Sequence, residues 1–331
     1  MYMPINPLVK LSKHWNTPDA LEKLGTRDGF GKGLVEAAKK HADIVGLTAD
    51  LGESTRMHLF AEAFPNRFIQ VGVAEQNLVT VASGLAAGGK IPFASGFGAF
   101  TPGRNWEQIR TTICYNNQPV QVVGTHTGIT VGEDGATHQV LEDIGLMRML
   151  PNMRVIVPAD AEQARKATLA MAKNPKPTYL RLGREKFPTF TTKSTPFEIG
   201  KADVYYRGSD VTIIAAGPQV YDALMVAVAL KGTVAVEVIN MHTIKPFDLE
   251  TVLKSVKKTG AVVTVEDHQI AGGLGGAVAE QLALHLPAPM EFIGVHDAFG
   301  ESGTAKELLE HFHITQKDII KAIHCVLARK K

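Results

Sequence analysis

The sequence predicts an α/β protein built from two consecutive domains, each with a mostly parallel sheet. The first observation is that strand-like apolar runs alternate with helical patterns along most of the 331 residues. Such alternation is typical of a parallel sheet covered by helices on both faces. The second is a stretch without periodicity, KFPTFTTKSTPFEIGK, rich in Thr, Pro and Lys, which separates two alternating halves. The chain is also long enough for two domains of ordinary size.

The first half follows a mixed N-terminal arm, residues 1–24, and we assign residues 25–187 to the first domain. Helical spacing of apolar residues appears in FGKGLVEAAKKHA, and a small-residue helical pattern appears in LVTVASGLAAGG. Short apolar runs bounded by turn residues predict strands at six places, namely residues 42–51, 67–73, 91–97, 120–126, 153–159 and 177–183.

The second half follows a linker that we place at residues 188–202, and residues 203–331 form the second, smaller domain. Here strand-like runs alternate again with helical patterns, which favours a second α/β unit. The predicted strands are residues 210–217, 233–240, 260–267 and 289–295. The predicted helices are residues 221–230, 249–256, the segment after AGGLGG, and 318–328.

Two motifs of this second half have a structural interpretation. The run GGLGG at residues 272–276 follows a predicted strand and opens a helix, but it lacks the full GxGxxG spacing of a dinucleotide site. We therefore assign these glycines to close helix–sheet packing. For Glu266-Asp267-His268 a structural or interface role is favoured, because nothing nearby supplies a nucleophile or a metal-binding set.

Composition excludes several classes of function. The formal net charge is +2 and no basic run suggests nucleic acid as a partner. No apolar run reaches membrane-spanning length and no signal peptide is recognisable. The two cysteines, Cys114 and Cys325, lie far apart, as expected for free thiols in a reducing cytoplasm. Sequences typical of serine hydrolases, zinc enzymes and P-loop enzymes are absent.

Polar residues gather where the predicted strands of the first domain end. These ends carry Asp50, Glu75, Phe97, His126 and Arg184. Ligands of parallel α/β sheets bind beyond the carboxyl ends of the strands, so these residues predict a site. Glu75 is the most informative, because a carboxylate where an apolar strand meets a helix is costly unless it has a partner.

Several motifs, in order, resemble the pyrimidine-binding domain of transketolases. They are a strand leading through Glu75-Gln76-Asn77 into a helix, FASGFGAF, THTGITVGEDGATHQ and YLRLGREKFP. The region from Val204 onward is similar to the transketolase C-terminal domain. The family's diphosphate-binding domain, with a GDG sequence and a later Asn, has no counterpart in this sequence. The resemblance therefore implies the C-terminal half of a split transketolase.

The resemblance implies partners and a cofactor. A diphosphate-binding N-terminal subunit would hold the diphosphate of thiamine diphosphate and Mg²⁺ or Ca²⁺, and two copies of each chain would form an α2β2 heterotetramer. The implied activity, part of the pentose phosphate pathway, moves a two-carbon ketol unit from a ketose phosphate to an aldose phosphate. Thiamine diphosphate supplies the carbanion equivalent that side chains cannot make. No metal ligand is expected on this chain itself.

Matching positions imply residues that contact the cofactor. Glu75 corresponds to the catalytic glutamate that hydrogen-bonds the pyrimidine ring nitrogen. The other positions implied to contact the cofactor are Asp50, Leu51, Val73, Phe97 and Phe100. The family's third aromatic residue falls near Gly103 in this sequence, so either the aromatic wall departs from the pattern or Trp106 rebuilds it.

A second set of matching positions implies contacts to substrate. Phosphate contacts are implied for Arg27, Ser54, His126 and Arg184, a sugar-hydroxyl contact for Asp134, and a catalytic place near the substrate carbonyl for His138. Arginine suits phosphate because its fork meets two oxygens, and histidine shuttles protons near neutral pH. The alternative for His138 is a cap on the following helix. Arg104 and Arg181 compete for a phosphate role.

Two alternative functions remain open at this point. One is a chain of a related thiamine diphosphate enzyme, similar to 1-deoxyxylulose-5-phosphate synthase or to the β subunit of 2-oxoacid dehydrogenases. The other is a non-catalytic interaction protein whose site has decayed. The joint presence of Glu75, His126, Asp134, His138 and Arg184 argues against decay, because buried polar groups without a ligand are costly.

Overall fold

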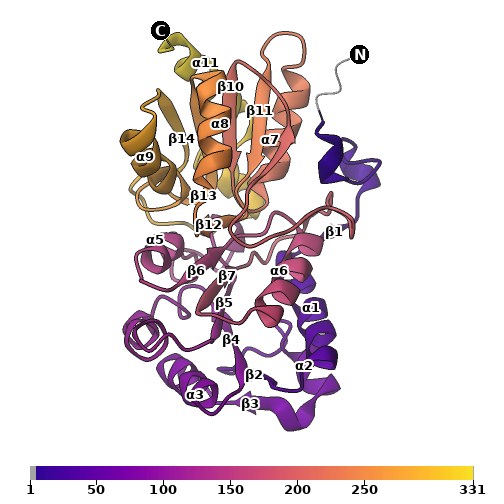
Figure 1. Cartoon of the computed structure of the whole chain (residues 1–331), viewed down its shortest axis with the longest axis vertical. Helices are drawn as coiled ribbons and strands as arrows, with labels where there is room; N and C mark the ends of the chain where they lie inside the picture. Colours follow the sequence, from indigo (N-terminus) through magenta and orange to yellow (C-terminus); the bar gives the residue numbers. More distant parts are fainter. Residues whose placement is uncertain (1–4, 331) are drawn as a thin grey trace.

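The computed structural model describes residues 5–330, which fold into two α/β domains stacked along the long axis of the molecule (Figure 1). Each domain is organised around one sheet, and the strands within each sheet are mostly parallel. The predicted fold class is therefore confirmed.

The first sheet has seven strands in the order β12-β6-β7-β5-β4-β2-β3. Its strands are β2 (Ile44–Thr48), β3 (Phe68–Gln70), β4 (Ile91–Phe97), β5 (Gln121–Thr125), β6 (Arg154–Ile156), β7 (Thr178–Arg181) and β12 (Thr243–Lys245). All neighbours in this sheet are parallel except β12, which comes from the second half of the chain and pairs antiparallel with β6. The second domain thus contributes an edge strand to the first sheet.

Helices cover this sheet and come from the segments before and between its strands (Figure 1). They are α1 (Thr26–Lys40), α2 (His58–Ala63), α3 (Glu75–Ala87), α4 (Trp106–Gln108) with the following π-helix (Ile109–Tyr115), α5 (Asp143–Arg148) and α6 (Ala161–Lys173). The start of α6 is fixed by Asp160, which accepts a hydrogen bond from the Gln163 amide at 2.8 Å. Asp160 also accepts hydrogen bonds from the amides of Phe190 and Thr191, so it ties the predicted linker to the first domain.

The second sheet has five strands in the order β14-β13-β10-β11-β9. They are β9 (Asp203–Tyr206), β10 (Val211–Ala215), β11 (Val236–Asn240), β13 (Val262–Gln269) and β14 (Met290–Val295), and only β9 runs antiparallel to its neighbour. The helices are α7 (Gln219–Ala229), α8 (Leu249–Thr259), α9 (Leu274–His285), α10 (Ala305–His311) and α11 (Gln316–Ala328). In α9, a Cβ at Gly275 would clash with Phe292 and Thr264, which fits the predicted close packing.

Two segments differ from the sequence-based expectation. The strand predicted at residues 67–73 ends at Gln70, and Val73 lies beyond it, 74% exposed. The predicted linker also packs closely, since Phe190 is fully buried and Pro188 belongs to the short strand β8 (Phe187–Pro188), which pairs with β1 (Lys23–Leu24). The first four residues of the predicted arm lie outside the described residues. Further along the arm, the Asn6 backbone amide donates to the Tyr205 carbonyl on β9. The domain boundaries themselves stay predictions.

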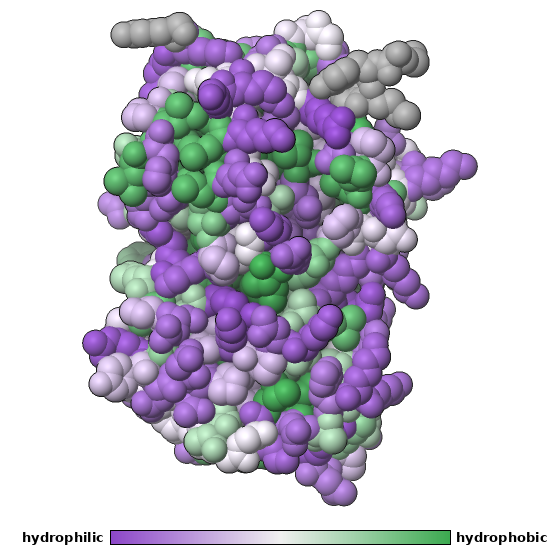
Figure 2. Space-filling view, in the orientation of Figure 1, coloured by the Kyte–Doolittle hydropathy of each residue, from purple (hydrophilic) through white to green (hydrophobic). Residues whose placement is uncertain are grey.

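The surface carries scattered apolar side chains. Figure 2 shows hydrophobic residues among polar ones, with a concentration in the half of the molecule where Figure 1 places α8 and α9. The most exposed large apolar side chains lie on both domains, namely Leu8, Val73, Tyr115, Met149, Leu284 and Phe299. Within the described part of the chain, no helix is long and apolar enough to span a membrane.

Candidate active site

The predicted site residues begin where three neighbouring parallel strands end. Strands β2, β4 and β5 end at Thr48, Phe97 and Thr125, and Asp50 and His126 follow closely. Asp50 and His126 adopt left-handed φ angles of 62° and 54°. This conformation is uncommon for residues other than glycine and is concentrated at functional sites, where the surrounding structure holds it in place. The carboxyl edge of the first sheet is therefore the candidate site.

Glu75 is the first residue of α3 and is only 3% exposed. Its carboxylate Oε2 accepts a hydrogen bond from Arg104 Nη1 at 2.9 Å, while Asn105 donates its side-chain amide to the Glu75 carbonyl at 2.8 Å. A carboxylate is also stabilised by the positive end of a helix. From the sequence, we expected a ligand to be the partner of this acid. The structure supplies Arg104, so burial alone does not demand a ligand.

An aromatic wall stands beside Glu75. Phe97 and Phe100 are stacked with centroids 6.3 Å apart, and the ring of His138 meets the Phe100 ring edge-on at 5.4 Å. The guanidinium of Arg104 lies 4.7 Å from the centroid of Phe100. This geometry allows a cation–π contact, which favours a planar cation over an aromatic face. The wall therefore has two phenylalanines, a histidine edge and a planar cation.

Neither of the two positions considered for a third aromatic ring completes this wall. A Cβ at Gly103 would clash with the carbonyl of Ala99, so this backbone admits only glycine there. Trp106 is engaged elsewhere, because its indole Nε1 donates to the carbonyl of Leu146 at 2.9 Å and its ring packs against the core. Of the two expectations, the structure favours a wall that departs from the family pattern over one rebuilt by Trp106.

His126 and Arg27 form a hydrogen-bonded unit at the end of β5. Arg27 Nη1 donates to the Ser54 carbonyl at 2.9 Å and to His126 Nε2 at 3.0 Å. Because arginine can only donate, Nε2 must be the acceptor nitrogen of the imidazole. The proton is then on Nδ1, which lies 3.0 Å from the Thr125 hydroxyl. In the described part of the chain, Arg27 Nε is buried without a hydrogen-bond partner.

Positive charge surrounds His126. Burial, followed by the charges of Arg27, Arg184 and Arg56, lowers the pKa of His126 to about 3, so the imidazole is neutral. Burial and the charge of Arg56 also lower the pKa of Arg27. Arg56 itself is held by Asp28, with Nε and Oδ1 2.6 Å apart. Three guanidinium groups near one neutral imidazole make a site suited to an anion.

Arg184 joins the strand end of β7 to the glycine-rich loop. Its Nη1 donates to the carbonyl of Val131 at 2.9 Å and lies 3.5 Å from Asp134 Oδ2. Glu133 is further away, at 4.0 Å. The hydroxyl of Thr137 lies 2.9 Å from His138 Nδ1. His138 does not cap a helix, because the next helix, α5, begins only at Asp143.

The predicted cofactor contacts that follow β2 and β3 lie apart from each other in exposure. Asp50 and Leu51 line a cavity of about 430 Å³ with Ser54, a predicted phosphate contact, and with Gln70, whose side chain accepts the Asp50 amide at 2.7 Å. Val73 is 74% exposed beyond the end of β3. An apolar side chain left this open is suited to contact with another surface or ligand.

The structure separates the two arginines that competed for a phosphate role. Arg104 pairs with Glu75, whereas Arg181 is buried and pairs with Asp143, with Nε and Oδ2 2.8 Å apart. Arg56, beside Arg27, was not among the residues predicted from the sequence. The sequence GESTR shows that this arginine is present. It does not show where the arginine lies, because residue 56 adopts a left-handed φ of 67°.

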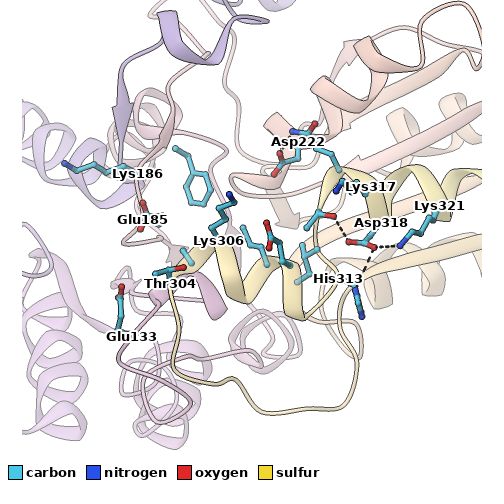
Figure 3. Close-up of a pocket in the computed structure, with 17 residues that line it drawn as sticks. Glu133, Glu185, Lys186, Asp222, Thr304, Lys306, His313, Lys317, Asp318 and Lys321 are labelled. Carbon is cyan, nitrogen blue, oxygen red and sulfur yellow. Dashed lines mark hydrogen bonds and ion pairs between the residues drawn. The ribbon is translucent and has the colours of Figure 1, made fainter.

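A larger cavity borders this sheet edge on the side of the glycine-rich loop, where Glu133 and Glu185 line it. It measures about 900 Å³ and lies between the first domain and helices α10 and α11 (Figure 3). Its lining mixes both signs of charge, for example Lys306 and Lys317 with Glu185 and Asp318. Asp318 already pairs with Lys321 at 3.1 Å. Mixed charge gives no preference for an anion, so size alone does not make this cavity the candidate site.

Across residues 5–330, no cluster of three or more His, Cys, Asp or Glu side chains is placed to hold a metal ion.

Family comparisons agree with both domains. Residues 22–189 match the model of the transketolase pyrimidine-binding domain, and residues 200–319 match that of the transketolase C-terminal domain. The chain is 42% identical over 323 residues to a 6-deoxy-6-sulfo-D-fructose transketolase subunit of Clostridium sp. (strain MSTE9), covering 97% of each chain. It is 35% identical to one of the apulose-4-phosphate transketolase subunits of Phocaeicola vulgatus (strain ATCC 8482), covering 90% of this chain and 96% of that protein.

A solved structure gives the same result. The chain is similar to a split-gene transketolase described as an inactive β4 tetramer, with a TM-score of 0.87 and 45% identity over 93% of this chain and 100% of the other. The resemblance predicted from the motifs is confirmed. With its pyrimidine-binding and C-terminal domains both matched, this chain belongs to the transketolase family.

Proposed function

We propose that the chain is the C-terminal, or β, subunit of a split transketolase. It would transfer a two-carbon ketol unit from a ketose phosphate to an aldose phosphate. The observation that carries this proposal is the pairing, on one sheet edge, of buried Glu75 beside an aromatic wall with an arginine-rich anion site. Among the described residues Arg27 Nε is buried without a hydrogen-bond partner, a cost that a decayed interaction protein would have no reason to keep.

The residues present fit the pyrimidine of thiamine diphosphate. Glu75, buried at a helix start, would hydrogen-bond the ring nitrogen, and Phe97 and Phe100 would enclose the ring in an apolar slot. Leu51 and Val73 would add apolar contacts, and Asp50 would lie near the reacting ring. When bound, this cofactor supplies the carbanion equivalent that ketol transfer requires.

The arginine-rich end would bind the sugar phosphate. Among the described residues Arg27 Nε has no partner, and with Arg184 it would meet the phosphate oxygens. Ser54 and His126 would complete this end. The imidazole of His126 is neutral and its Nε2 accepts from Arg27, so it would orient Arg27 toward the phosphate.

Between the two ends, Asp134 would bond a sugar hydroxyl and His138 would move a proton near the substrate carbonyl. His138 lies against Phe97 and Phe100, with centroids 6.2 and 5.4 Å away, so it borders both the aromatic wall and the loop of Asp134. A histidine in this place can act as a general acid or base toward the substrate.

The proposal includes a second chain. A diphosphate-binding N-terminal chain would contribute the Mg²⁺ or Ca²⁺ site and the diphosphate contacts, and two copies of each chain would form an α2β2 heterotetramer in the cytoplasm. Relatives of nearly the same length are named as transketolase subunits, which supports a two-chain enzyme. Exposed Val73 beside the proposed pyrimidine slot suits a surface that the second chain covers.

The anion site also fits a second substrate class. It is built from guanidinium groups, which bind sulfonate as well as phosphate oxygens. A relative that is 42% identical is named for 6-deoxy-6-sulfo-D-fructose. A sulfonated ketose is therefore the second candidate donor.

The test is a ketol-transfer assay of this chain with the N-terminal chain, thiamine diphosphate and Mg²⁺. Xylulose 5-phosphate and ribose 5-phosphate are offered first, and 6-deoxy-6-sulfofructose replaces the donor in a second series. Glu75→Ala should lower kcat by about a hundredfold or more, because one preorganised polar contact in an active site has an effect of that size. Glu62→Ala, an exposed acid on α2, is the matched control and should retain activity.

The outcomes distinguish the candidates. Activity that requires both chains and is lost only in Glu75→Ala supports the split transketolase. Activity with the sulfonated donor alone redirects the substrate assignment and retains the reaction class. An assembled complex that is inactive with every donor contradicts the proposal.

A further inference from the structure

The first turn of the glycine-rich segment 128–139 is hydrogen-bonded to one carboxylate of the second domain. Asp267, on β13, is 4% exposed. Its Oδ1 accepts the Ile129 amide at 2.9 Å, and its Oδ2 accepts the Thr130 hydroxyl at 2.7 Å and the Thr130 amide at 3.4 Å. One side chain of the second domain therefore holds the first turn of a segment that belongs to the first domain.

A glycine at position 128 leaves room for the carboxylate of Asp267 to approach the segment closely. Gly128 has a φ of +80°, and a Cβ there would clash with the carboxylate of Asp267. Glycine is required at such a position for both reasons. The backbone of Asp267 is held in turn, because buried Arg181 donates its Nη2 to the Asp267 carbonyl at 2.8 Å.

The far end of the segment has a second anchor. The Gln139 side-chain amide donates to the carbonyls of Gly132 at 3.0 Å and Glu301 at 2.8 Å. A Cβ at Gly300 would clash with Gln139, and one at Gly135 would press on Ser302. Both ends of the segment therefore pack closely against the second domain.

Between the two anchors lie three groups of the proposed substrate site. Asp134 and His138 belong to the segment, and Arg184 donates to its Val131 carbonyl at 2.9 Å. Because a shift of about 1 Å in a substrate-binding group can cost about a hundredfold in rate, what fixes the segment also fixes the site.

We propose that Asp267 is a positioning residue through which the second domain sets the placement of Asp134, His138 and Arg184 toward the sugar substrate. This inference rests on the proposed function and gives the second domain a task in it. Asp267 does not touch substrate. Removing its carboxylate charge should weaken substrate binding through Asp134 and Arg184, and it should slow the proton transfer assigned to His138.

The first measurement is hydrogen–deuterium exchange on the full chain, which needs no activity. In Asp267→Asn, the amides of residues 128–139 should exchange about tenfold faster, the equivalent of one weakened hydrogen-bonded anchor. Asp297→Asn is the matched control. It is the same change at an exposed position with a φ of 47°, which asparagine tolerates, and it should leave exchange unchanged.

Two variants on the opposite side of the contact guard against misfolding of Asp267→Asn. Thr130→Val removes the hydroxyl that donates to Asp267 and should also speed exchange of the segment. Thr130→Ser keeps this hydroxyl and should restore the slow exchange. A general loss of stability would instead speed exchange throughout the second domain.

The second measurement is steady-state kinetics in the complex with the N-terminal chain. Asp267→Asn and Thr130→Val should raise KM for the ketose phosphate about tenfold, through Asp134 and Arg184. They should also lower kcat about tenfold, because His138 moves with the segment. Unchanged exchange, or faster exchange with an unchanged KM, overturns the positioning role alone. A wild-type complex without ketol transfer overturns the proposed function instead, together with the substrate part of this inference.

Discussion

Two buried polar clusters of this chain use the same residue types in different ways. We call them the site cluster, which contains Arg27, Glu75, Arg104 and His126, and the junction cluster, which contains Asp143, Tyr179, Arg181 and His268. Each has a buried carboxylate paired with arginine, at 2.9 Å for Glu75–Arg104 and 2.8 Å for Asp143–Arg181. The arginine side chain is 50% exposed in the site cluster and 5% exposed in the junction cluster.

This difference separates a binding role from a structural one. In the junction cluster, Asp143 Oδ2 accepts from the Tyr179 hydroxyl at 2.6 Å as well as from Arg181. In the site cluster, the donor to Glu75 reaches solvent, and Arg27 Nε has no partner in the described part of the chain. A buried acid marks a candidate site when its partner can be exchanged, and marks a support when every contact is internal.

The comparison is tested most strongly at Asp143. Asp143→Ala leaves Arg181 charged and buried without its partner, so the free energy of unfolding should fall by about 3–5 kcal/mol. Urea denaturation of the full chain measures this loss. Asp43→Ala breaks an exposed pair with Lys90 and should cost less than about 1 kcal/mol. Equal losses in the two variants would refute the structural role of the junction cluster.

The buried histidines of the two clusters, His126 and His268, sharpen the comparison through pH. Burial lowers the pKa of His126 to about 3 and that of His268 to about 4, both below the ordinary value near 6.5. The unfolded chain therefore binds more protons below pH 6.5. Stability is fully present above that pH and is lost as the pH falls toward each folded-state pKa, by about 2 kcal/mol per histidine between pH 7 and pH 5.

Substitution distinguishes the two histidines. His126→Asn and His268→Asn should each remove that share of the pH dependence, measured by urea unfolding at pH 7 and pH 5. Only His268→Asn should also destabilise the protein clearly at pH 7, because His268 Nε2 accepts the buried Ile144 amide at 3.2 Å. An unchanged pH dependence in His126→Asn would show that this imidazole is not held neutral by the fold.

The fold and the site edge could be predicted from the sequence because both follow from local patterns. Alternating strand and helix signals predicted both sheets, and Asp50 and His126 could be placed because strand ends of a parallel sheet meet at one edge. Pairings between distant segments could not be predicted in this way. Arg104 reaches Glu75 across 29 positions and Asp267 reaches Thr130 across 137, and neither contact leaves a periodic signal.

The early end of β3 has a similar cause. Val71 and Val73 continue the apolar pattern of RFIQVGV, but β3 is an edge strand paired only with β2, and Gly72 then takes a φ of +72°. The backbone turns toward α3 at that glycine. A pattern of apolar side chains cannot show where an edge strand loses its pairing.

The smallest expected effect concerns Arg104 itself. Arg104→Gln exchanges the ionic partner of the buried Glu75 carboxylate for a neutral amide donor. Because Arg104 is half-exposed, water can also reach the carboxylate, which keeps the favourable end of α3, so the free energy of unfolding should fall by about 1–2 kcal/mol. Urea denaturation of Arg104→Gln and of Asp143→Ala, run in parallel, gives the ratio of the two losses in the free energy of unfolding. A loss as large as that of Asp143→Ala would mean that the Glu75–Arg104 pair supports the fold. A small loss would leave Glu75 free to exchange its partner, as the proposed contact with the pyrimidine requires.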